Sequence, residues 1–232
     1  MASKQDKLES VRKGPKLPKS GFAKGLDSDS LEHLEKYTLR ILENKSFANQ
    51  EARHIGFDQV LFQHVRLSNT HLKKAQLLDS RLTACDLANG EWPEATLQRL
   101  ELLDCHLTGF RAIEARLQDV LFQECSGSFV QLRFAVLKSV HFERCNLSGI
   151  DFQEAKLTNV SFVDCDLSEA DLSGATLVNV DLRGSKIDGM RAGVQELKGT
   201  TLDHTQALAF VRGLGIKVET AEPLAHPRST LQ

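Results

Sequence analysis

The chain has 232 residues, 41% hydrophobic and 26% charged, with 29 basic against 31 acidic side chains and a net charge of -2. This length is enough for one domain with a real core, and the charge balance excludes a strongly basic nucleic-acid binder over the whole chain. No apolar run approaches the roughly 18 residues of a membrane span, and the first residues lack the apolar segment of a secretory signal. The five cysteines, with no CxxC pair, argue against a secreted disulfide scaffold. We therefore expect a cytoplasmic protein without a membrane segment.

The N-terminal part divides into two expected regions. Residues 1–26 carry seven Lys or Arg against Asp6 and Glu9, with Gly and Pro breaks, which predicts a disordered basic arm; nucleic-acid contact by this arm is the alternative. Residues 27–50 are predicted to hold a helix that caps the next domain, because Asp29 and Glu32 can form a capping box. Apolar residues follow at helical spacing, at Leu31, Leu34, Ile41 and Leu42, with Thr38 between them.

A five-residue repeat occupies residues 51–203. Every fifth position from Phe57 to Leu202 is Leu or Phe in 25 of 30 cases, and the position two residues earlier is small in most repeats. A period of five fits neither an α-helix nor a plain strand. It requires a chain that turns a corner every five residues, and four corners close a coil of 20 residues. We predict an all-β solenoid of about 7.5 such coils.

Residues that are 20 apart should then stack in columns, and the sequence bears the pattern out. The cysteines are spaced by 20 throughout, at Cys85, Cys105, Cys125, Cys145 and Cys165. Stacked thiols with parallel Cβ directions can neither pair readily as disulfides nor converge on zinc, so this column is interpreted as structural core. No His, Cys, Ser or Gly motif indicates a metal, a cofactor or catalysis, and no enzyme activity is expected.

The repeats carry a family resemblance. Units such as Cys145-Asn146-Leu147-Ser148-Gly149 and Ala170-Asp171-Leu172-Ser173-Gly174 match the A-(D/N)-L-x-x motif. Over these residues the chain resembles the pentapeptide repeat proteins, which implies a right-handed quadrilateral β-helix. The best-known members are acidic rods that mimic duplex DNA, and they bind DNA gyrase or topoisomerase IV, in some cases protecting the enzyme from quinolones.

The charge of the repeat region suggests where such a partner would bind. Residues 51–202 hold 21 acidic and 16 basic side chains, a net of -5, and the acidic ones concentrate in the C-terminal half. The alternative is an ordinary solvated surface. A rod of this charge is not expected to bind DNA itself. The proposed acidic edge consists of Asp151, Glu154, Asp164, Asp166, Glu169, Asp171 and Asp181.

A second candidate surface is apolar. Phe129, Phe134 and Val136 occupy nominally outward positions of one coil, beside Gly127, which interrupts the Leu/Phe column. Clustered exposed apolar residues mark an interaction site, and the alternative is that some of them fold back over the corner. This patch would serve a general interaction scaffold with a partner unrelated to topoisomerases.

The C-terminal part is predicted to cover the other end of the solenoid. Residues 204–218 are expected to form a short helix, stopped by Gly213 or Gly215, and a strand over 216–218. This arrangement is similar to the dimerising end of quinolone-resistance-type and albicidin-resistance-type members, and a plain cap is the alternative. The tail 219–232 is expected to be flexible. The resemblance implies homodimer contacts at Leu208, Phe210, Val211 and Leu214.

Overall fold

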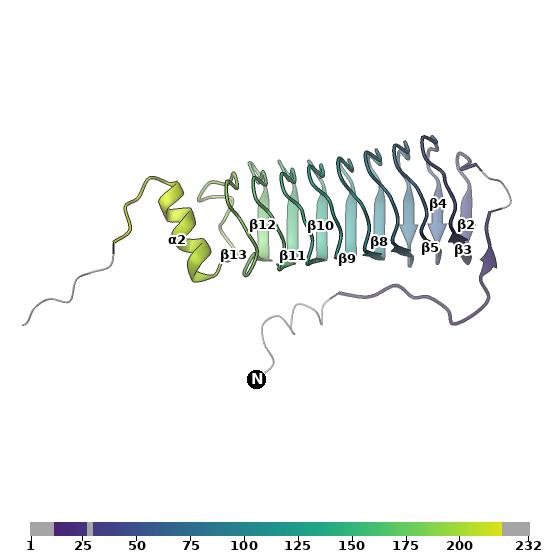
Figure 1. The fold of residues 1–232 in the computed structure, drawn as a ribbon, viewed down its shortest axis with the longest axis horizontal. Coiled ribbons are helices and arrows are strands. Elements are labelled where there is room, and N and C mark those ends of the chain that lie inside the picture. Colours follow the sequence, from purple (N-terminus) through teal and green to yellow (C-terminus); the bar gives the residue numbers. More distant parts are fainter. Residues whose placement is uncertain (1–11, 27–29, 220–232) are drawn as a thin grey trace, which may run out of the picture.

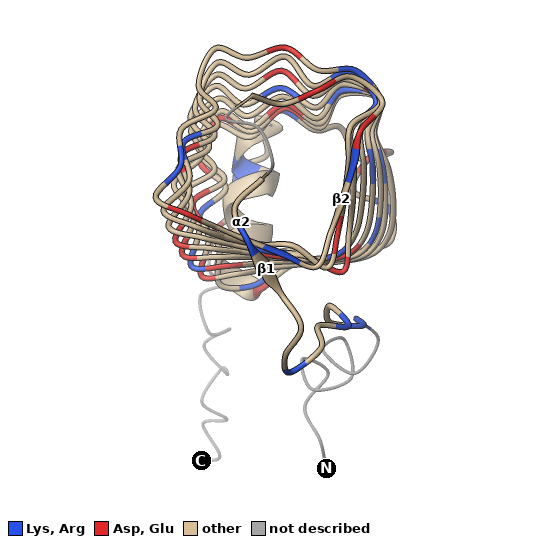
Figure 2. Ribbon diagram, turned by 90° about the vertical axis from the view of Figure 1, so that its right-hand side faces the viewer, with Lys and Arg blue, Asp and Glu red and all other residues tan. Residues whose placement is uncertain are grey.

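The computed structural model describes residues 12–26 and 30–219. The chain winds into a four-sided parallel β-solenoid of about nine turns, with one helix at its C-terminal end (Figures 1 and 2). Every fifth residue lies in the left-handed region, for example Asn69, Asp104 and Asn159 at φ of 53–54°. These residues are the corners of the coil. Asn, Asp and Gly suit them because they adopt positive φ at little cost.

The strands lie on two adjacent sides of the coil and pair in register with the next turn. Between Val136 and Glu143, for instance, Phe142 pairs with Phe122 before it and Phe162 after it. The predicted 20-residue register is therefore confirmed. The strands are β1 Ala23–Lys24, β2 Lys36–Thr38, β3 Arg40–Glu43, β4 Gly56–Asp58, β5 Leu61–Gln63, β6 Gln76–Leu78, β7 Arg81–Thr83, β8 Thr96–Leu103, β9 Arg116–Gln123, β10 Val136–Glu143, β11 Lys156–Val163, β12 Thr176–Asp181 and β13 Thr200–Thr201.

The interior is a stack of identical or volume-matched side chains. The rings of Phe122, Phe142 and Phe162 lie parallel, with centroids 4.7 and 4.9 Å apart. The five cysteines of the column are all buried and unpaired, as predicted for core residues. The Cys105 thiol donates to backbone carbonyls of Leu82 and Leu103, and hydrogen bonding to the neighbouring thiols together with burial raises its pKa. These cysteines therefore act as small core residues.

The predicted N-terminal capping helix is wrong for the described residues 30–50. They form the first coil of the solenoid instead, in which Tyr37 pairs with Phe57 and Leu42 with Phe62. Leu34 is a corner at φ 63° and is exposed, whereas a helix would have buried it. The repeat is hidden here because the small positions carry Glu35 and other polar residues, which the open end of the coil tolerates. Asp29, the expected cap, lies outside the described residues.

The predicted disorder of the arm is also wrong for residues 12–26. β1 pairs with β3 and extends the sheet beyond the first coil, and the residues before β1 run back along the rod (Figure 1). Main-chain groups of this segment bond to side chains of Gln59, Asp79 and Asp119. Composition alone indicated disorder because it cannot register such long-range partners. Residues 1–11 lie outside the described residues.

The C-terminal helix α2, His204–Gly213, is confirmed, with a capping box between Asp203 and Gln206. It lies across the end of the solenoid, where the Gln206 amide donates to the carbonyls of Leu182 and Ser185. Gly215 follows the helix at φ 79°, as a C-terminal stop requires. The strand predicted over 216–218 is wrong, because these residues are irregular and pair with no strand in the part of the chain that the structure describes. Residues 220–232 of the predicted tail lie outside the described residues.

Candidate functional site

The inside of the solenoid leaves little room for a ligand. Two apolar spaces within the coil hold only about 20 and 10 Å³, bounded by core side chains such as Leu102, Phe142 and Phe162. A cavity of that size admits at most a single water. Side chains that meet another molecule must therefore come from the outward positions, which lie in columns along the rod.

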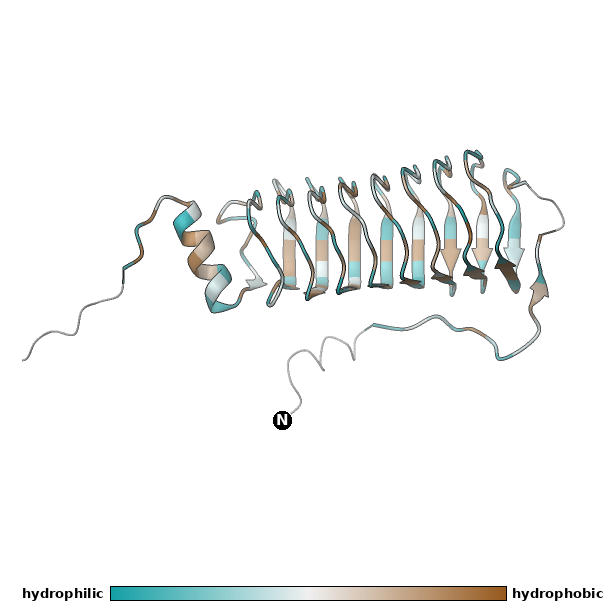
Figure 3. Cartoon of the chain, viewed as in Figure 1, coloured by the Kyte–Doolittle hydropathy of each residue, from teal (hydrophilic) through white to brown (hydrophobic). Residues whose placement is uncertain are grey.

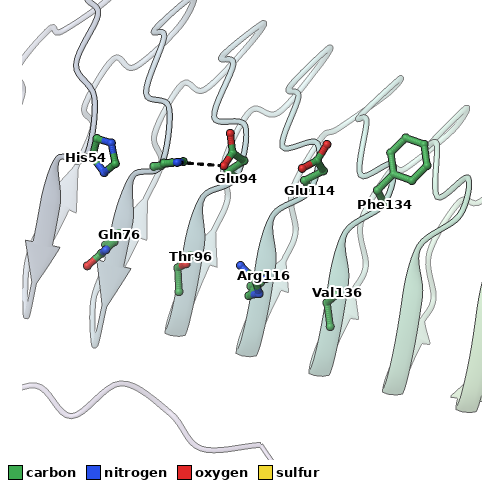
Figure 4. Close-up of a pocket in the computed structure, with 9 residues that line it drawn as sticks. His54, Gln76, Glu94, Thr96, Glu114, Arg116, Phe134 and Val136 are labelled. Atoms are coloured by element: carbon green, nitrogen blue, oxygen red, sulfur yellow. Dashed lines mark ion pairs between the residues drawn. The ribbon is translucent and has the colours of Figure 1, made fainter.

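One edge of the rod is hollowed into an open groove of about 490 Å³ (Figure 4). Its walls are a corner column and the start of the next side. Lys74 and Glu94 form an ion pair in it, with 3.4 Å between Nζ and Oε2. The groove has apolar residues at one end and mixed charges along its length. Its lining residues are His54, Lys74, Gln76, Glu94, Thr96, Glu114, Arg116, Phe134 and Val136.

The apolar end of this groove belongs to the predicted patch. Phe134 is 55% exposed, Val136 42% and Phe129 64%, so none of the three folds back over the coil. Val130 and Leu147, rather than Phe129, lie next to the space that a Cβ on Gly127 would take. Phe129 and Phe134 both occupy corners, at φ of 58° and 57°. This conformation costs any corner side chain other than Gly, Asn or Asp about 1 kcal/mol, so it does not single out the two phenylalanines. Their exposed apolar surface does, because clustered exposed apolar residues mark interaction sites.

Phe129 covers a neighbouring corner. A Cβ on Gly149 would lie 2.7 Å from Phe129 Cδ1, so the ring rests on a position where only glycine leaves space. Gly149 has φ 66°. Phe129 does not line the groove, because its corner column and that of Phe134 are separated by one side of the coil.

The structure separates the residues of the predicted acidic edge. Asp151 and Asp171 are stacked neighbours on one side of the coil, as predicted, and Asp166 lies on the preceding side. Asp181 lies in β12, on a third side. The corner residues Glu154, Asp164 and Glu169 fall on three different corners, because they are not a multiple of 20 apart. The seven carboxylates are therefore spread over three of the four sides of the rod instead of forming one stripe.

Basic residues pair with four of these seven carboxylates. Asp151 pairs with Arg133, Asp166 with Lys186, Asp171 with Arg191 and Asp181 with Arg183. Burial opposes ionisation of Asp171, but bonds from Ser173, Gln153 and Arg191 hold its pKa below the usual value. Two of these four pairs, Asp166–Lys186 and Asp171–Arg191, join residues 20 apart, and so do Glu101 with Arg81 and Glu124 with Arg144. The column spacing in the sequence was the signal that could have identified them.

The predicted dimer contacts lie on and after α2. Leu208, Phe210 and Val211 are half-buried, and Leu214 is exposed. A cleft of about 250 Å³ separates the helix from the last coil, between Phe210, Leu214 and the side chains of Ile187 and Met190. Figure 3 shows the apolar part of α2 in brown. The helix therefore covers the end of the core incompletely.

Among the described residues, no three His, Cys, Asp or Glu side chains gather closely enough to hold a metal ion. In the same part of the chain, none of the helices has the length and apolar character needed to cross a bilayer.

The fold and its outward columns define a class of protein: a closed solenoid whose surface residues repeat every 20 positions. The family described as "Pentapeptide repeat region" matches residues 75–147 and 135–208, together more than half of the chain. The chain belongs to the pentapeptide repeat family. No curated protein matches it.

The chain is also similar to several solved structures at low identity. Full-length QnrB1, "a plasmid-mediated fluoroquinolone resistance protein", is 21% identical with a TM-score of 0.44, covering 84% of this chain and 100% of that one. A trypsin-treated form is 24% identical with a TM-score of 0.43, covering 84% and 99%. HetL from the cyanobacterium Nostoc sp. strain PCC 7120, "involved in Heterocyst Differentiation Regulation", is 19% identical with a TM-score of 0.31, covering 72% and 91%.

Proposed function

We propose that this chain is a non-catalytic binding rod that engages a protein partner at the groove ending in Phe134 and Val136. The observation that carries the proposal is the exposed ring of Phe134 in the groove, where the other corner residues, His54, Lys74, Glu94 and Glu114, are polar. Aromatic side chains next to a concave surface are common anchors of protein interfaces.

The groove also indicates the kind of partner. Its apolar end is followed by Arg116, Glu114 and the Lys74–Glu94 pair, so a polypeptide with an apolar side chain flanked by charges of both signs fits it. The charged rim would orient the partner, and Phe134 would supply most of the affinity.

Crosslinking followed by affinity measurement tests this proposal. A photo-crosslinking residue in place of Glu114 captures the partner in cells, and the dissociation constant is then measured with purified proteins. We expect Phe134→Ser to weaken binding at least tenfold, in line with the loss of an interface anchor. Val178→Ser is the matched control, because Val178 is also an exposed apolar residue but lies outside the groove. Equal affinities of the two variants would contradict the proposal.

A type II topoisomerase, DNA gyrase or topoisomerase IV, is the more specific candidate partner. The resemblance to topoisomerase-binding members of the family supports it, as do three corner carboxylates outside the ion pairs described above, those of Glu154, Asp164 and Glu169. We expect the purified chain to alter supercoiling by gyrase or its quinolone sensitivity, and Glu154→Lys, Asp164→Lys and Glu169→Lys combined to abolish the effect. If gyrase and topoisomerase IV are both unaffected, this candidate fails while binding at Phe134 stands.

Homodimerisation through α2 is tested by sedimentation of a Phe210→Ser variant.

A further inference from the structure

The N-terminal arm lies against one corner column of the rod. Gln59 Nε2 donates to the carbonyl of Lys16 (2.7 Å), the Lys16 N–H donates to Asp79 Oδ1 (2.8 Å), and the Lys13 N–H donates to Asp119 Oδ1 (3.2 Å). Gln59, Asp79, Arg99 and Asp119 are successive corners of one column, and Arg99 already binds the Asp79 carboxylate through two hydrogen bonds of 2.6 and 2.7 Å. The column therefore holds an extended segment through main-chain groups, which every non-proline residue possesses.

Charge and conformation complement these bonds. Residues 12–19 have the sequence RKGPKLPK, with four basic side chains and no acidic one. Arg12 pairs with Glu101 beside the column (3.5 Å), although Arg81 lies closer to the same carboxylate (2.7 Å). The carboxylates of Asp79 and Asp119 are buried, and because Asp79 is paired with Arg99, the charge that the column offers a basic segment comes chiefly from Asp119. Pro15 and Pro18 restrict the segment to extended backbone. A basic, extended, proline-containing peptide is thus the ligand that this face already holds.

The fit between arm and rod is incomplete. Within the described residues, Arg12 Nη1 and His141 Nε2 are buried without a hydrogen-bond partner. Unsatisfied buried groups weaken the contact. Nothing in the main-chain bonds or in the ion pair requires this particular sequence, so another basic segment with the same backbone can replace it.

We propose that the column of Gln59, Asp79 and Asp119, with Glu101 beside it, is a docking site for a basic, proline-containing extended peptide of a protein partner. In the free protein the site is occupied by residues 12–19 of the same chain, which compete with the partner's peptide. The tether gives the arm an effective concentration of about millimolar, so the partner's segment must out-compete it. The column borders the same side of the coil as the groove at Phe134 but shares no lining residue with it, and the two proposals stand or fall independently.

Hydrogen exchange on the full chain tests the docking site. The probe is an isotope-labelled synthetic peptide RKGPKLPKSGF, added in excess, and the readout is the exchange rate of the Lys13 and Lys16 amides. We expect the peptide to displace the arm and accelerate these amides at least tenfold, with an effect that declines as salt is added. A peptide with Gln at every basic position should leave them protected. No acceleration at millimolar peptide, or equal acceleration by both peptides, overturns the proposal.

A pair of corner variants supplies the second arm of the experiment. Asp119→Asn removes the charge that accepts the Lys13 N–H, and we expect at least tenfold faster exchange of that amide. Asp104→Asn is the matched control, because Asp104 is a corner of another column at φ 53°. Amides of the core strands report that both variants remain folded. Identical arm exchange in the two variants contradicts a charge-selective docking site.

Discussion

Lowering the pH should loosen the arm through His141. This side chain is only 3% exposed, and its Nδ1 lies 2.9 Å from Ser161 Oγ. Burial, reinforced by the nearby Arg12 charge and opposed by Asp119, lowers the pKa of His141 to about 4. In a solvated state the pKa is about 6.5. The released state therefore takes up a proton first, and docking of the arm is favoured above pH 6.5 and weakens as the pH falls towards 4.

The size of this effect follows from the two pKa values. At pH 5 these two pKa values weaken the free energy of arm docking by about 2 kcal/mol relative to neutral pH, if release fully exposes the ring. This corresponds to a roughly 30-fold change in the docking equilibrium. NMR titration of the His141 ring in the full chain measures its pKa, and exchange of the Lys13 amide at pH 5 and 7.5 measures the docking. His141→Gln should remove most of the pH dependence. A ring pKa near 6.5, or the same pH dependence in His141→Gln, would refute the reasoning.

Three further substitutions test the packing and the corners. Phe142 lies between two stacked rings, and Phe142→Ala should lower the free energy of unfolding, measured by chemical denaturation, by about 4 kcal/mol. A loss below about 1 kcal/mol would mean that the stack contributes little to stability. Phe134→Asn should raise stability by about 0.5–1 kcal/mol, because Asn accepts the left-handed corner, and an unchanged or lower melting temperature would contradict the strain assigned to it. Gly149→Ala should destabilise by more than 1 kcal/mol, since its Cβ would clash with Phe129; Phe129→Ala in the same chain should recover part of the loss.

The repeat region was predictable because its pattern is strictly local. Each five-residue unit carries its own large and small inward residues, so the columns through Cys105 and Phe142 follow from counting alone. The first coil was missed because no complete coil packs on its outer side, and polar residues such as Glu35 are tolerated where an internal coil needs small ones. Tyr37 and Leu42 already continued the repeat.

The surface was less predictable, for a different physical reason. The exposure of Phe129 and Phe134 followed from their outward positions in the repeat. The pairing of the acidic residues with basic ones was not predicted. Ion pairs such as Asp171–Arg191 form between successive turns, and a count of charges along the chain does not detect them. The arm contacts connect Lys13 to Asp119 across more than 100 residues, and no local pattern predicts them.

The affinity of the partner for Phe134→Asn tests the central claim most directly. If the chain is a binding rod that works through the groove, this variant is at least as stable as the parent chain but binds the crosslinked partner at least tenfold more weakly. A Phe134→Asn variant that folds and binds with unchanged affinity would show that the functional surface lies elsewhere on the rod.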